Sequence, residues 1–340
     1  MMNRALTKRR WLEQALTVSG LGVAVACVAG LALMTLRTSV RLTAPPGYTH
    51  PLHELRQHGQ AMSAPAWVFG DDPQERFGLP FQDVSFPTAD GSTLRGWLVP
   101  GSADGEDSQQ GIGIVAAHAR GGDRRGYLEH LPAFHARGFT TLLFDYREHG
   151  LSDGAGRGMS LGQREAEDIV AAVHFLKACH QLKKIGVIGH SLGGSSVILA
   201  AAQDAQIDAV VAESSVASFE TYVGDMTEQW VRQRRVPSLR PLWQGWWPPL
   251  VVALSAWRMG LDSMSAPTDN VDRIAPRPLL LIHGTDDDIV APTHSERLLA
   301  RASQPRELWL IPGVTHSTPY TAFPSTYFPR IVSFFSTALR

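Results

Sequence analysis

Short apolar runs alternate with longer amphipathic segments over most of the chain after residue 80. Six of the apolar runs are expected to be strands: 113–117, 139–145, 185–188, 209–212, 277–282 and 307–311. Between most of them, apolar positions recur every three or four residues, as on the buried face of a helix. Ser160 with Gln163 is expected to form a capping box ahead of one such helix. Strands that alternate with helices predict βαβ units, and therefore an α/β fold with a mostly parallel central sheet and helices on both faces.

Two segments depart from this alternation. Residues 81–100 hold two strand-like runs around Asp90-Gly91, which predicts an antiparallel hairpin ahead of the parallel strands. Residues 216–270 contain five of the nine tryptophans and five prolines. We interpret this stretch as a helical cap inserted into a domain that covers residues 81–340. Its apolar part, 248–261, either roofs an acyl pocket, lies on a membrane surface or only forms the core of the cap.

An uncharged apolar run of 22 residues, 15–36, precedes all of these elements. As a helix it would span about 33 Å, which is enough to cross a bilayer. Four basic residues precede the run and two follow it, so the positive-inside rule keeps the N-terminus in the cytoplasm. We predict a single-pass membrane protein whose catalytic domain is extracytoplasmic, with a tail at 1–10, an anchor at 11–37 and a juxtamembrane linker at 38–80. A cleaved signal peptide, or lipoprotein cleavage before Cys27, is the alternative.

Composition narrows the class of partner. The 340 residues include 31 basic and 32 acidic side chains, for a net charge of −1, and this balance argues against a nucleic-acid partner. The two cysteines, Cys27 and Cys179, give no disulfide framework, and no spacing typical of a metal site occurs. We therefore expect no metal and no organic cofactor, while the oligomeric state is left open.

A short glycine-rich motif lies between a predicted strand and a predicted helix. It reads Gly189-His190-Ser191-Leu192-Gly193, after the apolar run 185–188 and before a helix-compatible run at 195–202. A Gly-x-Ser-x-Gly sequence at such a turn is typical of a nucleophile elbow, in which the glycines let neighbouring backbone pass closely. The N-terminus of the following helix favours developing negative charge. Ser191 is therefore the candidate nucleophile.

Acyl transfer on a serine also needs a base, a carboxylate that orients the base, and donors for an oxyanion. An aspartate run at 286–288 and His316 each follow a predicted strand. Because the carboxyl ends of parallel strands meet at one edge of a sheet, these side chains are expected to converge on Ser191. Glu213, at another strand end, is the alternative orienting acid.

Four stretches together resemble the α/β-hydrolase superfamily, over about residues 81–340. GHSLG resembles the elbow of that family, and DYREHGLS resembles its Asp-x-Arg-Gly-x-Gly-x-Ser strand end. HGTDDDIV resembles its His-Gly-x-x-Asp-x-x-Val segment, and GVTHS resembles the loop that carries the general base. The resemblance implies the α/β-hydrolase fold and a triad of Ser191, Asp287 and His316, with Asp286 and Asp288 as competitors for the acid. It implies architectural roles for His118, His149 and His283, which occupy recurring family positions. His190 lies inside the elbow, and we expect it to be a packing or hydrogen-bonding neighbour rather than a proton carrier.

The resemblance also implies an oxyanion hole made by the backbone N–H groups of Leu192 and Arg120. The chain departs from the family pattern by having Ala119 and Glu148 where glycine is usual. Three arginines near the predicted mouth, Arg120, Arg124 and Arg125, either bind a substrate anion or belong to a solvated loop.

These residues predict a serine hydrolase that cleaves a carboxylic ester or related acyl bond through an acyl-enzyme on Ser191. The expected substrate is a small-molecule or lipid-like acyl compound. A serine peptidase or aminopeptidase, a thioesterase and an acyltransferase are alternatives, because fold and triad do not choose the leaving group. A non-catalytic binding protein of the same fold is a further alternative, which the retention of all three triad residues disfavours.

Overall fold

The computed structural model of the protein describes residues 28–43, 72–103, 111–234, 245–316 and 319–340. Its centre is one eight-stranded sheet in the order β1-β2-β4-β3-β5-β6-β7-β8. β2 is antiparallel to both of its neighbours. The remaining strands, β4, β3, β5, β6, β7 and β8 in spatial order, are parallel to one another. The predicted hairpin and the mostly parallel sheet are thereby confirmed. The strands are β1 (Gln82–Pro87), β2 (Thr93–Val99), β3 (Ile112–Ala117), β4 (Thr140–Asp145), β5 (Lys184–His190), β6 (Ala209–Glu213), β7 (Leu279–Gly284) and β8 (Arg306–Ile311).

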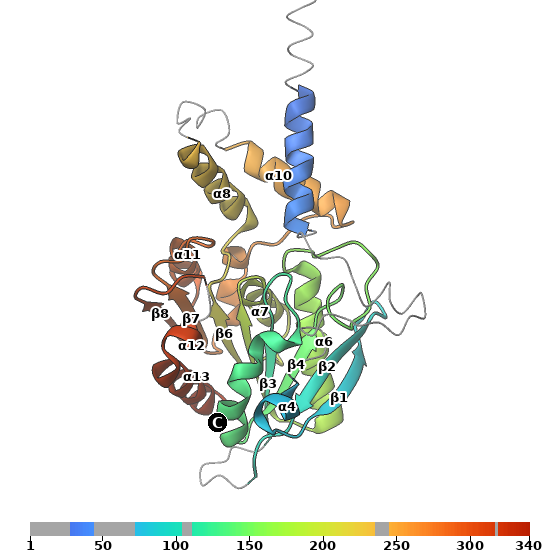
Figure 1. Ribbon diagram of the computed structural model, residues 1–340, viewed down its shortest axis with the longest axis vertical. Coiled ribbons are helices and arrows are strands. Elements are labelled where there is room, and N and C mark those ends of the chain that lie inside the picture. Colours follow the sequence, from blue (N-terminus) through green and yellow to red (C-terminus); the bar gives the residue numbers. More distant parts are fainter. Residues whose placement is uncertain (1–27, 44–71, 104–110, 235–244, 317–318) are drawn as a thin grey trace, which may run out of the picture.

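Helices connect most of these strands, and they cover both faces of the sheet (Figure 1). Those with α-helical geometry are α4 (Pro73–Phe77), α5 (Leu131–Ala136), α6 (Gln163–His180), α7 (Leu192–Gln203), α8 (Phe219–Gln233), α10 (Trp247–Arg258), α11 (Thr293–Arg301), α12 (Pro319–Ala322) and α13 (Pro324–Ala338). Three 3₁₀ segments accompany them, η1 (Arg124–His130), η3 (Pro267–Asp269) and η4 (Val271–Ile274).

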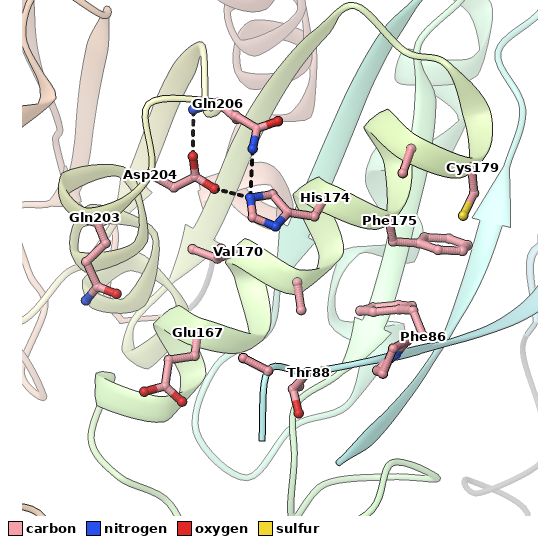
Figure 2. Close-up of a pocket in the computed structure, with 14 residues that line it drawn as sticks. Phe86, Thr88, Glu167, Val170, His174, Phe175, Cys179, Gln203, Asp204 and Gln206 are labelled. Atoms are coloured by element: carbon pink, nitrogen blue, oxygen red, sulfur yellow. Dashed lines mark hydrogen bonds and ion pairs between the residues drawn. The ribbon is translucent and has the colours of Figure 1, made fainter. Parts of the chain in front are cut away.

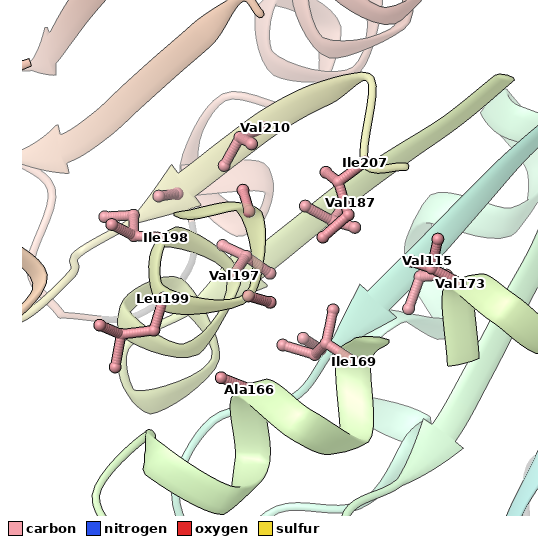
Figure 3. Close-up of a cluster of buried hydrophobic side chains, with 14 of the residues drawn as sticks. Val115, Ala166, Ile169, Val173, Val187, Val197, Ile198, Leu199, Ile207 and Val210 are labelled. Atoms are coloured by element: carbon pink, nitrogen blue, oxygen red, sulfur yellow. The ribbon is translucent and has the colours of Figure 1, made fainter. Parts of the chain in front are cut away.

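Alternate residues of the central strands supply two separate cores. Val115 of β3 and Val187 of β5 pack against α6 and α7 on one face, where the cluster also includes Ile169 and Val197 (Figure 3). The neighbouring strand residue Ile114 points to the opposite face and joins the cluster that includes α5 and α13. Both faces of the strands are therefore apolar, and this explains why the strands appear as nearly continuous apolar runs in the sequence.

The start of α6 differs from the sequence-based expectation. The helix begins at Gln163, and its N-cap is Gly162 rather than Ser160. The carboxylate of Glu165 accepts hydrogen bonds from the backbone N–H groups of Ser160 and Gly162, at 2.8 Å each. The predicted pair of Ser160 with Gln163 was wrong because a nearby buried carboxylate satisfies these donors instead.

Residues 28–43 form a helix that stands beside α8 and α10 on one side of the sheet domain (Figure 1). Residues 38–43, predicted as the start of a linker, continue this helix. Thr35, Ser39 and Thr43 recur every four residues on it, and all three are buried. Polar groups of α10 satisfy their hydroxyls. The bonds run from Trp247 Nε1 to Thr35 Oγ1 (3.2 Å), between the Ser255 and Ser39 hydroxyls (2.9 Å), and from Arg258 Nη1 to Ser39 and Thr43 (3.1 and 3.2 Å).

Most of the predicted membrane anchor, residues 11–27, lies outside the described residues, and so does most of the predicted linker, 44–71. Within the described part of the chain, no helix combines the length and the apolar character that crossing a membrane requires.

Candidate active site

The turn between β5 and α7 holds Ser191 in a strained backbone conformation. Its φ of 56° and ψ of −113° are neither helical nor extended, and a positive φ is costly for a residue with a side chain. The Ser191 N–H donates to the carbonyl of Glu213 at 2.8 Å, which ties the turn to the end of the neighbouring strand β6. The hydroxyl thus projects from a backbone that the surrounding sheet holds in place.

Two glycines make this turn sterically possible. A Cβ on Gly189 would lie 2.3 Å from the carbonyl oxygen of Gly193, and a Cβ on Gly193 would lie 2.1 Å from that of Ala117. Neither separation is compatible with a side chain. The Gly-x-Ser-x-Gly spacing is therefore required by the close approach of β5, α7 and the end of β3.

Three side chains from different strand ends form a hydrogen-bonded chain at this edge of the sheet. His316 Nε2 lies 3.0 Å from Ser191 Oγ, and His316 Nδ1 lies 2.7 Å from Asp287 Oδ2. Asp287 follows β7 and His316 follows β8. The structure thus brings together the candidate nucleophile, base and acid that the sequence predicts, within hydrogen-bond distance of one another.

Asp287 is held as a carboxylate. Its Oδ1 accepts the backbone N–H groups of Ile289 at 3.0 Å and Val290 at 2.8 Å. Burial raises the pKa of Asp287, but hydrogen bonds from His283, His316 and the Val290 backbone outweigh burial and hold this pKa below its ordinary value. The charge therefore persists at neutral pH and orients the Nδ1–H of His316.

The competing aspartates of the same run play other parts. Asp286 is exposed and accepts a hydrogen bond from the hydroxyl of its neighbour Thr285 at 2.9 Å. Asp288 is also exposed. Neither has a hydrogen bond to His316 among the described residues.

Two further histidines, His283 and His190, contact Asp287 and His316 respectively. His283 Nε2 lies 3.2 Å from Asp287 Oδ2, a contact that the sequence did not reveal. His190 Nε2 lies 2.9 Å from the backbone carbonyl of His316 and so supports the loop of the base. Burial and the neighbouring His316 lower the pKa of His190 to about 4, so its neutral ring donates to that carbonyl rather than taking up a proton.

The loop after β3 approaches the elbow as a tight turn. The Gly122 N–H donates to the Ala119 carbonyl at 3.1 Å, and Gly121 has a positive φ of 70°, as a type II turn requires. His118 Nδ1 also donates to the Ala119 carbonyl, at 2.8 Å. The hydrogen bond that closes this turn uses the N–H of Gly122. The N–H of Arg120, which lies at the corner of the turn, does not take part in that bond. Leu192, the other predicted donor, is the first residue of α7.

The three arginines near the mouth are engaged by the protein itself. Arg124 is buried and pairs with Asp145, with 2.5 Å between Nη2 and Oδ2. Arg125 pairs with Asp123. Arg120 Nη1 donates to the carbonyl of Arg41, at 3.0 Å, in the last turn of the 28–43 helix. Arg120 also lines a cavity beside this helix.

Glu148 explains one departure from the family pattern. It adopts a positive φ of 66°, the conformation that glycine usually supplies. Its carboxylate accepts the backbone N–H groups of Ala155, Gly156 and Arg157, at 2.7 to 3.1 Å. These bonds tie down the loop that follows and offset the strain at Glu148.

Glu213, the alternative acid, belongs to a buried network beside the triad. Its carboxylate accepts the hydroxyls of Tyr127 at 3.1 Å and Tyr327 at 2.5 Å, and Tyr327 Oη lies 2.9 Å from His130 Nε2. Burial raises the pKa of Glu213 from 4.5 to about 7, although the tyrosine bonds oppose this shift. No hydrogen bond joins Glu213 to His316 among the described residues, so of the two candidate acids it is Asp287 that contacts His316.

This raised pKa predicts a pH-dependent stability. An acid whose pKa is higher in the folded state stabilises the fold below its unfolded value, near pH 4.5, and this contribution is lost as the pH rises through about 7. The full shift corresponds to about 3 kcal/mol in the free energy of unfolding. We expect Glu213→Gln to gain stability relative to the wild type between pH 5 and pH 8, as measured by urea unfolding. A difference between the two proteins that is the same at both pH values would contradict this expectation.

A separate hollow lies along α6, away from the triad (Figure 2). Its floor includes His174, whose Nε2 lies 2.6 Å from Asp204 Oδ2 and 2.9 Å from Gln206 Nε2. Asp204 follows the C-terminal end of α7, and a twelve-residue helix places it about 18 Å from the Ser191 end. This hollow therefore does not serve Ser191. In the part of the chain that the structure describes, no cluster of His, Cys, Asp and Glu side chains could hold a metal ion.

Comparisons with known proteins agree with this architecture. The model of a family described as the alpha/beta hydrolase family matches residues 114–327. The uncharacterized protein YfhR of Escherichia coli K12 is 25% identical over 277 residues, which cover 80% of this chain and 84% of YfhR. A polyketide transferase of Stachybotrys chlorohalonatus is 25% identical over 276 residues, which cover 69% of this chain and 89% of the transferase.

Solved structures show the same fold. The esterase Pf2001 of Pyrococcus furiosus superposes with a TM-score of 0.61 at 21% identity, covering 80% of this chain and 96% of the esterase. The hypothetical protein PA2218 of Pseudomonas aeruginosa superposes with a TM-score of 0.58 at 22% identity, covering 82% of this chain and 99% of PA2218. These two likenesses concern the arrangement of the chain and not its substrate.

Proposed function

Because the chain belongs to the alpha/beta-hydrolase family, we propose that this hydrolase is a serine esterase that forms an acyl-enzyme on Ser191. The single observation that carries the proposal is the continuous chain of hydrogen bonds from Ser191 through His316 to Asp287, at 3.0 and 2.7 Å. Such a chain activates a serine hydroxyl that is otherwise a weak nucleophile.

In the proposed mechanism, His316 Nε2 takes the proton of Ser191 Oγ as this oxygen attacks the substrate carbonyl. The backbone N–H groups of Leu192 and Arg120 then stabilise the oxyanion, and the positive end of the α7 dipole adds to this stabilisation. Protonated His316, oriented by the Asp287 carboxylate, gives its proton to the leaving alcohol. Water, deprotonated by the same histidine, attacks the acyl-enzyme and releases the acid and free Ser191.

Substrate profiling of the full chain in non-ionic detergent tests the choice of leaving group. We expect hydrolysis of p-nitrophenyl esters, with kcat/KM at least tenfold above that for aminoacyl p-nitroanilides of similar size. Acyl thioesters of matched chain length provide the comparison with a thioesterase. Turnover of the anilides with little turnover of the esters would instead indicate a peptidase.

An acyltransferase is the second candidate, and the observation that favours it is the similarity to a polyketide transferase. Both activities share the acyl-enzyme and differ in the acceptor that resolves it. Adding a primary alcohol to the ester assay separates them, because a transferase would convert most of the acyl group into a new ester, whereas a hydrolase releases mainly the free acid.

We also propose that the protein is held at a membrane through its N-terminal segment, with the catalytic domain on the extracytoplasmic side. Large apolar side chains support this placement, because nine of the twelve that are exposed in the described residues lie on or next to three neighbouring helices. These nine are Val28, Leu33, Leu36, Val40, Met226, Trp230, Trp246, Leu250 and Trp257. Tryptophans at such positions are typical of a membrane interface.

Carbonate extraction of membranes tests the anchor. A protein held by a helix in the bilayer stays in the membrane pellet at high pH, because the apolar contacts that retain it do not depend on charge. We therefore expect the full chain in the pellet, and its complete release into the supernatant would contradict the proposal.

A further inference from the structure

A cavity of about 540 Å³ lies between the 28–43 helix and the cap helices α8 and α10. Met34, Arg37, Thr38 and Arg41 recur at intervals of three and four residues, so one face of the 28–43 helix lines the cavity. A different face of this helix carries the buried hydroxyls that bond to α10. The 28–43 helix is therefore a wall of the cavity, although the sequence predicts residues 28–37 as the end of a membrane anchor and 38–43 as the start of a linker.

The remaining walls are largely apolar. The α8 wall includes Tyr222, Met226 and Trp230, and Trp247 is the first residue of α10. Aromatic and thioether side chains of this kind suit an alkyl chain, which they contact without needing hydrogen bonds. The cavity is large enough for a small molecule with an apolar chain.

The charged side chains in the described lining of the cavity are all basic. Three arginines border it, Arg37, Arg41 and Arg120, and its described lining includes no carboxylate. Arg37 and Arg41 are exposed, and no ion pair to them occurs within the described residues. Guanidinium groups bind carboxylates and phosphates through paired hydrogen bonds, so Arg37 and Arg41, which pair with no carboxylate of the described chain, favour an anionic amphiphile beside the apolar wall.

The cavity adjoins the proposed catalytic centre. Arg120 both lines the cavity and supplies a proposed oxyanion donor through its backbone, while its guanidinium holds the carbonyls of Arg41 and Leu42. Leu42, another lining residue, belongs to the same buried cluster as Leu192, which follows the nucleophile. A ligand in this cavity would thus lie next to the loop that faces the reacting carbonyl.

From this juxtaposition we propose that the cavity is the binding site for one end of the substrate, and that the substrate is an anionic amphiphile. The apolar chain lies along the α8 wall, and the anionic group pairs with Arg37 and Arg41. This inference rests on the proposed esterase function, and it makes the N-terminal helix part of the substrate site.

Calorimetric titration of the full chain in non-ionic detergent tests the inference without turnover. The probes are octyl phosphate and octanoate, which carry the two kinds of anionic group, and 1-octanol, which has the same chain and no charge. We expect at least one of the anions to bind tenfold or more tightly than octanol. The anion that binds more tightly identifies which group the substrate carries.

Two changes to the cavity should remove this preference. Arg37→Gln combined with Arg41→Gln is expected to weaken binding of the preferred anion at least tenfold while octanol binding changes less than twofold. Thr227→Glu adds a carboxylate to the α8 wall and keeps both arginines. It should also weaken binding of the anion more than binding of octanol. The control, Arg273→Gln combined with Arg301→Gln, removes the same charge from exposed positions outside the cavity and should leave all three affinities unchanged.

Equal binding of the anions and octanol to the wild type would overturn the inference, and so would equal losses in the cavity variants and the control. These results are independent of the esterase activity, because calorimetry reports binding even when Ser191 is replaced by alanine. Failure of the esterase function would appear instead as ester turnover that does not depend on Ser191.

Discussion

Ser191→Ala is expected to lower kcat/KM for a p-nitrophenyl ester by at least about 10⁴-fold, because no other group can form the acyl-enzyme. The residual rate would come from substrate binding and the oxyanion donors. Initial rates at equal protein concentration, with folding checked by circular dichroism, provide the measurement.

Ser196→Ala is the matched control for Ser191→Ala. Ser196 also lies on α7, but its hydroxyl returns a hydrogen bond to the Leu192 carbonyl of its own helix at 2.7 Å. We expect this variant to keep its activity within a few-fold of the wild type. Retention of more than a tenth of the activity by Ser191→Ala would refute the assignment of the nucleophile.

Asp287→Asn is expected to cause a loss of about 10⁴-fold in kcat, comparable to the loss on removing the nucleophile. An asparagine NH₂ can donate to His316 Nδ1 and thereby stabilise the tautomer whose proton is on Nε2. In that tautomer the ring faces Ser191 with a donor and is unable to accept the serine proton. Measuring kcat on the full chain at several pH values tests the loss.

The neighbouring aspartates supply the controls for Asp287→Asn. Asp286→Asn and Asp288→Asn replace exposed carboxylates without a hydrogen bond to His316 in the described structure, so each should keep kcat within a few-fold of the wild type. A larger loss in either of them than in Asp287→Asn would show that Asp287 is not the acid of the triad.

The sequence predicted the sheet and the location of the site because both follow from local patterns. Buried parallel strands are apolar on both faces, so each produced a recognisable run, and the turn at Ser191 requires glycines at fixed neighbouring positions. The order of strands then determines which ends meet. Ser191, Asp287 and His316 therefore meet at one edge because each follows a strand whose end can be predicted from the local sequence alone.

Contacts between side chains and more distant parts of the chain were harder to predict from the sequence. Arg124 was assigned to the mouth of the site, but it pairs with Asp145, which lies 21 positions later. Nothing in the local pattern around Glu148 indicates that its carboxylate binds three backbone N–H groups of the following loop. Such partners depend on the path of the loops, which hydrophobic periodicity does not specify.

The N-terminal helix illustrates the same limit. The apolar run 15–36 predicted an anchor that overlaps only the first part of the 28–43 helix, whereas the role of this helix as a wall of a cavity depends on contacts with residues about 200 positions away. The four-residue spacing of Thr35, Ser39 and Thr43 was a usable signal, because hydroxyls repeated on one face of an apolar helix indicate a polar partner. That partner, α10, lies in a segment whose fold the sequence described only as a cap.

Labelling with a fluorophosphonate, followed by intact mass measurement and peptide mapping, tests the proposed nucleophile most directly. Organophosphorus probes of this kind react with an activated serine, so their adduct identifies the residue that attacks the substrate. The account predicts one adduct per chain, on the peptide that contains Ser191, and no adduct in Ser191→Ala. An adduct on another residue, or equal labelling of the wild type and Ser191→Ala, would contradict it.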